Sequence, residues 1–178
     1  VQGPPGTGKT TTSSLIVSVH RSLTGGCLVC AASNVAVDTF AVALKAESEP
    51  FARFGSDVTS QFRELLKENC PELKTVEYLE ANDYTRDGGA WKRNIKKAII
   101  DALKDKATTT LATLGSVSSE KASMNMRSYL YFLLDEAAQA TEHETNCALA
   151  RVDKSGSVCL AGDHQQLPPF SRNEKVKE

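Results

Sequence analysis

Residues 3–10, Gly-Pro-Pro-Gly-Thr-Gly-Lys-Thr, constrain the fold of this chain more than any other segment. They match the phosphate-binding loop pattern G-x-x-x-x-G-K-[ST] at every fixed position. Glycines in such a loop let backbone N–H groups turn inward around a polyphosphate without a clash from a Cβ atom. Lys9 can then reach the β- and γ-phosphates, and the Thr10 hydroxyl can bind Mg²⁺. The segment therefore predicts a nucleotide site at the start of a helix rather than an ordinary glycine-rich turn.

A pair of carboxylates, Asp135-Glu136, follows the apolar run Tyr129–Leu134. A run that is apolar throughout is typical of a strand buried on both faces of a parallel sheet. Two carboxylates at the end of such a strand are costly unless a metal ion or water receives them. Alone, the pair would suit an acidic helix N-terminus equally well. Beside a phosphate loop we expect Asp135 to contact Mg²⁺ and Glu136 to act as the general base for water.

Strand-like runs alternate with helical patterns along most of the chain. One predicted helix follows Thr10 and ends at Gly25-Gly26, and Asn34 is expected to open a second helix as its cap. The alternation predicts an α/β fold with a mostly parallel sheet flanked by helices, and ligands bind beyond the carboxyl ends of such strands. The strand-like runs are Cys27–Ala32, Phe51–Phe54, Thr108–Ala112, Tyr129–Leu134 and Ser157–Ala161.

The segment from about 46 to 106 is long for a crossover connection, and we interpret it as a helical insertion. Helical patterns within it cover 62–70 and 91–103. The second pattern continues into a basic stretch up to 106, which we interpret as a solvated face rather than a phosphate-tracking groove. Residues 171–178 are charged and lack a core pattern, so we expect a linker. Residues 1–178 are thus predicted to form one domain that is incomplete at its N-terminus.

The composition restricts the partners and the cellular location that we expect for this chain. The formal net charge is −1, so a nucleic-acid surface has to be local. No apolar run reaches membrane-spanning length and no signal peptide is visible, so no membrane partner is expected. Cys27 and Cys30 have zinc-knuckle spacing, but no second pair completes a site, and we expect their thiols on opposite faces of a strand. Buried, reduced cysteines fit an intracellular protein, cytoplasmic or nuclear.

Four segments, in order along the chain, resemble motifs I, Ia, II and III of superfamily 1 helicases of the type that includes senataxin and the RNA helicase of nonsense-mediated decay. The resemblance spans nearly the whole chain and implies the first RecA-like domain of such a helicase, with a P-loop NTPase fold. It implies ATP and Mg²⁺ as cofactors and single-stranded nucleic acid, RNA favoured over DNA, as partner. The four segments are Gly3–Thr10, Ala32–Asp38, Asp135–Glu142 and Gly162–Pro169.

Roles in ATP chemistry follow from the resemblance residue by residue. Lys9, Glu136 and Gln166 are implied to be catalytic, with Gln166 sensing the γ-phosphate and Asp163 supporting its loop. Thr10 and Asp135 are implied to bind the metal ion. The implied nucleotide site consists of Gly3, Pro4, Pro5, Gly6, Thr7, Gly8, Lys9, Thr10, Thr11 and Gln166.

The resemblance also implies contacts to a nucleic-acid strand. Ser33 and Asn34 are implied to touch the backbone of a single strand, although Ser33-Asn34 alone would be an ordinary helix cap. Thr113 and Gly115 fall where a further backbone-contacting loop is expected.

The second RecA-like domain of the family, whose arginines complete the ATP site, is not found in this sequence. Because an arginine finger raises turnover by orders of magnitude, we expect low activity of this chain in isolation. The expected function is that of an ATP-hydrolysing motor domain of a helicase that translocates on single-stranded nucleic acid. The alternative is a non-catalytic, nucleotide-dependent nucleic-acid-binding scaffold, which the intact Lys9, Thr10, Asp135, Glu136 and Gln166 disfavour.

Overall fold

The computed structural model of the chain describes residues 1–4, 6–54, 109–120, 122, 126–166 and 168–169. The predicted helices within 62–70 and 91–103, most of the predicted insertion, Pro5 and the predicted linker 171–178 lie outside these residues.

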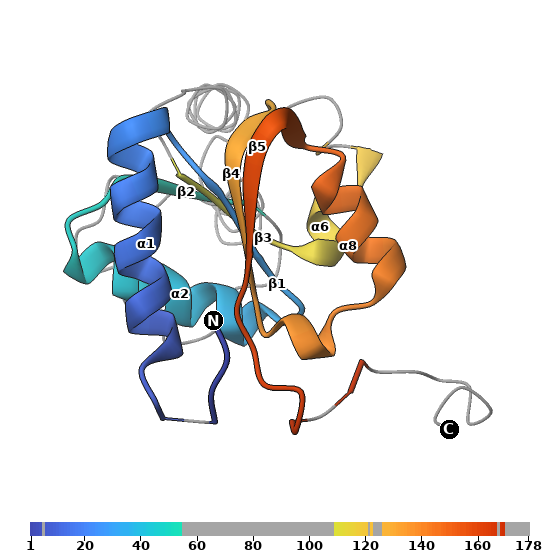
Figure 1. Cartoon of the computed structure of the whole chain (residues 1–178). Coiled ribbons are helices and arrows are strands. Elements are labelled where there is room, and N and C mark those ends of the chain that lie inside the picture. The colour runs from blue at the N-terminus through green and yellow to red at the C-terminus, as the bar shows by residue number, and fades with distance from the viewer. Residues whose placement is uncertain (5, 55–108, 121, 123–125, 167, 170–178) are drawn as a thin grey trace, which may run out of the picture.

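A parallel sheet forms the centre of the described fold (Figure 1). Its strand order is β2-β3-β1-β4-β5, and every pairing of neighbours is parallel. The predicted α/β class with a parallel sheet is therefore confirmed. The strands are β1 (Leu28–Ala31), β2 (Phe51–Phe54), β3 (Thr109–Thr113), β4 (Tyr129–Asp135) and β5 (Val152–Leu160).

Each strand lies where a strand-like run predicted it, but β5 begins at Val152 rather than at Ser157. Among the described strands β5 pairs with β4 alone, and much of it is exposed. Polar residues such as Asp153 and Lys154 are therefore tolerated in the first half of β5. A search for apolar residues does not detect this part of the strand.

Helices cover both faces of the sheet, so the described part of the chain has three layers (Figure 1). On one face, α1 (Lys9–Thr24) and α2 (Asn34–Ala46) enclose a core that includes Val17, Phe40 and Leu133. On the other face, α6 (Leu114–Val117) and α8 (Glu142–Leu149) enclose a second core. Cys27 belongs to the first core and Cys30 to the second, which confirms that their thiols lie on opposite faces.

The start of α2 differs from the prediction. Its N-cap is Ser33, whose hydroxyl accepts a hydrogen bond from the Ala36 amide at 3.1 Å. Asn34 is instead the first residue of the helix, so its prediction as the cap is wrong. Both residue types are good caps, and the extended backbone of Ser33 (φ −118°, ψ 152°) places its side chain over the first turn.

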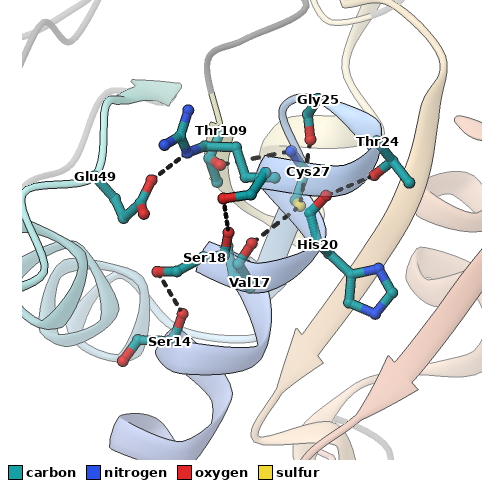
Figure 2. Close-up of polar contacts among 11 residues, drawn as sticks. Ser14, Val17, Ser18, His20, Thr24, Gly25, Cys27, Glu49 and Thr109 are labelled. Carbon is teal, nitrogen blue, oxygen red and sulfur yellow. Dashed lines mark hydrogen bonds and ion pairs between the residues drawn. The ribbon is translucent and has the colours of Figure 1, made fainter.

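The far end of α1 is tied to the rest of this layer (Figure 2). The helix ends at Gly25, which has φ 91°, as the Gly25-Gly26 pair predicted. The thiol of Cys27 lies 3.7 Å from the Val17 carbonyl oxygen, and Arg21 on α1 forms an ion pair with Glu49. These contacts tie the C-terminal half of α1 to segments that follow it in the chain. Among the described helices, none is both long and apolar enough to cross a bilayer.

Candidate nucleotide-binding and nucleic-acid-binding site

The carboxyl ends of three neighbouring strands lie level at one edge of the sheet. Ala31 at the end of β1 is in register with Thr113 of β3 on one side and with Asp135 of β4 on the other. The segments that leave these strands, with Ser33 and Glu136 among them, therefore meet at this edge. This is the edge at which parallel α/β sheets bind their ligands.

The phosphate loop has the backbone that its glycines predict. Gly6 and Gly8 have φ values of 76° and 81°, which side chains other than glycine rarely adopt. Gly8 is the N-cap of α1 and lacks a side chain, so no described side chain caps this helix. The first amides of α1 are consequently available to an anion, and the helix dipole favours negative charge at this point.

The ammonium group of Lys9 folds back onto the loop. Its Nζ donates hydrogen bonds to the carbonyl oxygens of Gly3 at 2.5 Å and Pro4 at 2.9 Å. The hydroxyl of Thr7 donates to the same Pro4 oxygen at 2.8 Å. The loop is thus closed around the lysine, whose charge lies inside the turn where a phosphate would be received.

Thr10 and Asp135 meet across the gap between loop and sheet. The Thr10 hydroxyl lies 3.5 Å from Asp135 Oδ2, and the Asp135 carboxylate, 5% exposed, accepts a hydrogen bond from the Glu136 amide through Oδ1. Burial raises the pKa of Asp135, against smaller lowering contributions from the Glu136 amide, Lys9 and Thr10. A hydroxyl and a carboxylate are hard oxygen donors of the kind that Mg²⁺ takes one or two of from a protein, so these residues fit the predicted ion.

Glu136 has an unusual backbone. Its φ of 53° and ψ of 39° place a non-glycine residue in the left-handed region, a conformation that clusters at functional sites. Its Oε2 accepts a hydrogen bond from the Ser33 hydroxyl at 3.3 Å. Burial and the nearby Asp135 raise the pKa of Glu136, and the Ser33 hydroxyl and the Lys9 charge act in the other direction. The carboxylate is half-buried and faces the segment that follows β1.

The segment after β5 runs beside the start of the phosphate loop. The Gly162 amide donates to the Val1 oxygen at 3.0 Å, and the Gly3 amide donates to the Gly162 oxygen at 3.3 Å. Asp163 is 8% exposed, and its Oδ1 accepts from the Gln165 amide at 3.0 Å while its carbonyl accepts from Gln166. Asp163 therefore braces the turn that carries Gln166, next to the phosphate loop.

The residues predicted to touch a strand lie at the starts of α2 and α6. Thr113 is the N-cap of α6 and accepts from the Ser116 amide at 3.2 Å, while Gly115 is exposed on that helix. Ser33 reaches toward Glu136 as described, so the structure brings part of this set to the nucleotide site. Asn34 points in a different direction, because its Oδ1 accepts from Arg53 Nη2 at 2.7 Å.

One residue near this site was not found from the sequence. Arg53, in the middle of β2, is fully buried, and its Nε donates to Asp38 Oδ1 at 3.0 Å. Its guanidinium also donates to the Phe54 carbonyl oxygen and to Asn34. The sequence signal that could have revealed Arg53 was a charged residue inside the otherwise apolar run Phe51–Phe54. A buried arginine requires an acidic partner, so this charge indicated an ion pair.

The family model described as "AAA domain" matches residues 1–70 and 57–173 of this chain. The chain is 32% identical, over its whole length, to the ATP-dependent helicase NAM7 of Saccharomyces cerevisiae and covers 19% of that protein. It is 34% identical over 99% of its length to a regulator of nonsense transcripts 1 homolog of Arabidopsis thaliana, covering 15% of it. It is 31% identical over 96% of its length to the RNA helicase Mov10l1 of Homo sapiens, covering 13% of it.

The chain thus spans a fifth or less of the length of each of these relatives. Its parallel sheet, its phosphate loop and the Asp-Glu pair at the end of β4 agree with the resemblance drawn from the four motifs. Because the family model covers most of the chain, and the likeness to these helicases runs from end to end, the chain belongs to the AAA domain family, as a first RecA-like domain of the superfamily 1 helicase type.

Proposed function

We propose that this chain is the ATP-binding and ATP-hydrolysing motor domain of an intracellular helicase that translocates on single-stranded nucleic acid, with RNA favoured over DNA. The observation that carries the proposal is the meeting of Thr10 and Asp135. The Thr10 hydroxyl and the Asp135 carboxylate are 125 residues apart in the sequence and lie 3.5 Å apart in the structure. Two hard oxygen donors beside a lysine-bearing loop suit a metal-bound nucleotide.

In this function Lys9 exchanges the carbonyl oxygens of Gly3 and Pro4 for the β- and γ-phosphates of ATP. The amides at the start of α1 add further donors. Thr10 and Asp135 would hold Mg²⁺, which neutralises the charge that develops on the transferred phosphoryl group. Glu136 accepts a proton from the attacking water, and Gln166, on the turn braced by Asp163, reports the γ-phosphate.

Strand binding is assigned to the starts of α2 and α6, through Ser33, Asn34, Thr113 and Gly115. Contacts from such positions reach phosphates and sugars, so they orient a strand without reading its sequence. RNA is favoured because relatives named as RNA helicases or as regulators of nonsense transcripts align with nearly the whole chain. A second RecA-like domain would supply the other half of the groove and the arginines of the ATP site.

Calorimetric titration of the 178-residue chain with Mg-ATP tests the nucleotide half of this proposal. We expect saturable binding that Lys9→Ala abolishes. The matched control is Lys45→Ala, which removes an exposed lysine from the last turn of α2, away from the phosphate loop. Loss of binding in both variants, or in neither, would contradict the site. Binding without any hydrolysis above the Lys9→Ala background would favour the scaffold function instead.

A further inference from the structure

The hydroxyl of Ser33 makes two hydrogen bonds that point to different parts of the molecule. It accepts from the Ala36 amide at 3.1 Å, inside the first turn of α2, and it donates to Glu136 Oε2 at 3.3 Å. A hydroxyl has one hydrogen and two lone pairs, so both bonds can exist at once. The strand order brings the two residues together, because Ala31 of β1 is in register with Asp135 of β4.

Glu136 needs such a contact to be held in one place. Its left-handed backbone fixes where the side chain starts, but a glutamate side chain keeps several rotatable bonds beyond that point. The Ser33 bond occupies Oε2, and this leaves Oε1 for a water molecule. A general base works best when it is already held in a productive orientation, since a displacement of about 1 Å can cost on the order of 10²-fold in rate.

We propose that Ser33 is a positioning residue for Glu136 and couples strand binding at the start of α2 to water activation at the ATP site. The inference rests on the proposed function and extends it. Ser33 is the N-cap of α2, and the next residue, Asn34, is held from inside the protein by Arg53. Any contact that fixes the first turn of α2 therefore also fixes the hydroxyl that holds the base. A bound nucleic-acid strand is expected to strengthen the hydrogen bond from Ser33 to Glu136 and so raise the rate of ATP hydrolysis.

The test is single-turnover ATP hydrolysis by the 178-residue chain in excess over labelled ATP, with and without oligouridine. The parent chain is expected to hydrolyse ATP faster than Lys9→Ala does, and faster still with oligouridine. Ser33→Gly removes the hydroxyl, but glycine is nearly as good an N-cap, so the fold should be kept. This variant should be at least about tenfold slower than the parent and should not respond to oligouridine.

Two further variants separate positioning from stability. Ser33→Thr keeps a hydroxyl that can cap and donate, and it should restore both the rate and the response to oligouridine. Thr39→Ala removes an exposed hydroxyl from the same helix, away from Glu136, and should behave as the parent. Thermal unfolding of each variant reports any loss of fold, and Mg-ATP binding should be the same in all of them.

The outcomes distinguish this inference from the function on which it rests. If the parent rate does not exceed that of Lys9→Ala, the proposed hydrolysis fails and the inference fails with it. If the parent hydrolyses ATP but Ser33→Gly matches it, or if Ser33→Thr does not restore the rate, Ser33 does not position Glu136. A Ser33→Gly chain that is slow but still responds to oligouridine, or a parent that does not respond, refutes the coupling.

Discussion

Arg53 and Asp38 form an ion pair inside the protein that joins β2 to α2. The Arg53 Nε lies 3.0 Å from Asp38 Oδ1, and the exposed fractions of the two side chains are 0% and 4%. The same guanidinium holds Asn34. Breaking a buried ion pair by removing one of its members is strongly destabilising, so the first turn of α2 depends on this pair.

Arg53→Met should therefore lower the free energy of unfolding by about 3–5 kcal/mol, because it leaves Asp38 charged and buried without this arginine. Chemical denaturation measures the loss. The comparison is Arg21→Met, which breaks the ion pair with Glu49, where the side chains are 25% and 12% exposed. Solvent screening reduces that pair to about 0–1 kcal/mol. Equal losses in the two variants would show that burial does not distinguish these pairs.

Glu136→Gln should separate nucleotide binding from hydrolysis. The amide keeps the size of the side chain but cannot accept the proton of the attacking water. We expect Mg-ATP affinity by calorimetry close to that of the parent, and single-turnover hydrolysis reduced by about 10²-fold or more. The parent itself should hydrolyse ATP well below the range of about 1–100 s⁻¹ that complete phosphoryl-transfer enzymes reach. A Glu136→Gln chain that loses ATP binding as Lys9→Ala does would refute this division of roles.

Asp135→Asn should weaken the binding of the Mg²⁺ ion that supports ATP binding. The amide retains an oxygen to accept from the Thr10 hydroxyl but loses the charge that favours the cation. In titrations at increasing Mg²⁺, the concentration that gives half of the maximal ATP affinity should rise several-fold, while affinity without Mg²⁺ should not fall. The prediction is wrong if the Mg²⁺ response matches that of the parent.

The two cysteines in the cores should be unreactive in the folded chain. Burial raises the pKa of Cys27 from its usual 9.0 to about 12 and also raises that of Cys30. A raised thiol pKa contributes stability that is complete below pH 9 and is lost as the pH rises toward 12. Alkylation read by peptide mass spectrometry should label the partly exposed Cys147 and Cys159 before Cys27 and Cys30. Labelling of Cys27 or Cys30 at pH 8 at the rate of the unfolded chain would contradict this.

Local patterns predicted most of the sheet, because most of the strands are short runs rich in apolar or β-branched residues. Contacts between distant segments could not be predicted in this way. The order of the strands is not their order along the chain, and only that order places Ser33 against Glu136. Similarly, the acidic partner of Arg53 comes from α2, which precedes β2 in the chain. The sequence of β2 alone therefore could not predict the partner of this arginine.

The predicted cap of α2 failed for a related reason. Ser33 and Asn34 are both favoured at N-caps, and sequence preference alone does not choose between neighbours. The choice is made by tertiary structure, since Asn34 is held by Arg53 and Ser33 is free to accept from the Ala36 amide. The roles of all the predicted site residues toward ligands stay predictions. The structure places Thr113 at the end of β3, and Gly115 and Gln166 beyond the ends of strands.

Asn34→Asp should keep or raise thermal stability but weaken the binding of nucleic acid. Aspartate keeps an oxygen for Arg53 Nη2, which lies 2.7 Å from Asn34 Oδ1, and its charge favours both the guanidinium and the start of a helix. Thermal stability should therefore be equal to or above that of the parent. A negative charge beside a strand phosphate should weaken binding of fluorescent oligouridine by about tenfold at low salt, and the difference should shrink as salt rises.

Two comparisons make this measurement specific to the start of α2. Thr39→Asp adds the same charge at an exposed position further along the helix, so it accounts for any effect of net charge alone. Anisotropy with oligothymidine over the same salt series shows whether the strand is recognised through its backbone, in which case both oligomers should lose affinity together. If Asn34→Asp binds oligouridine at low salt as tightly as the parent, Asn34 serves only to anchor α2 to Arg53, and the strand contact assigned to it is wrong.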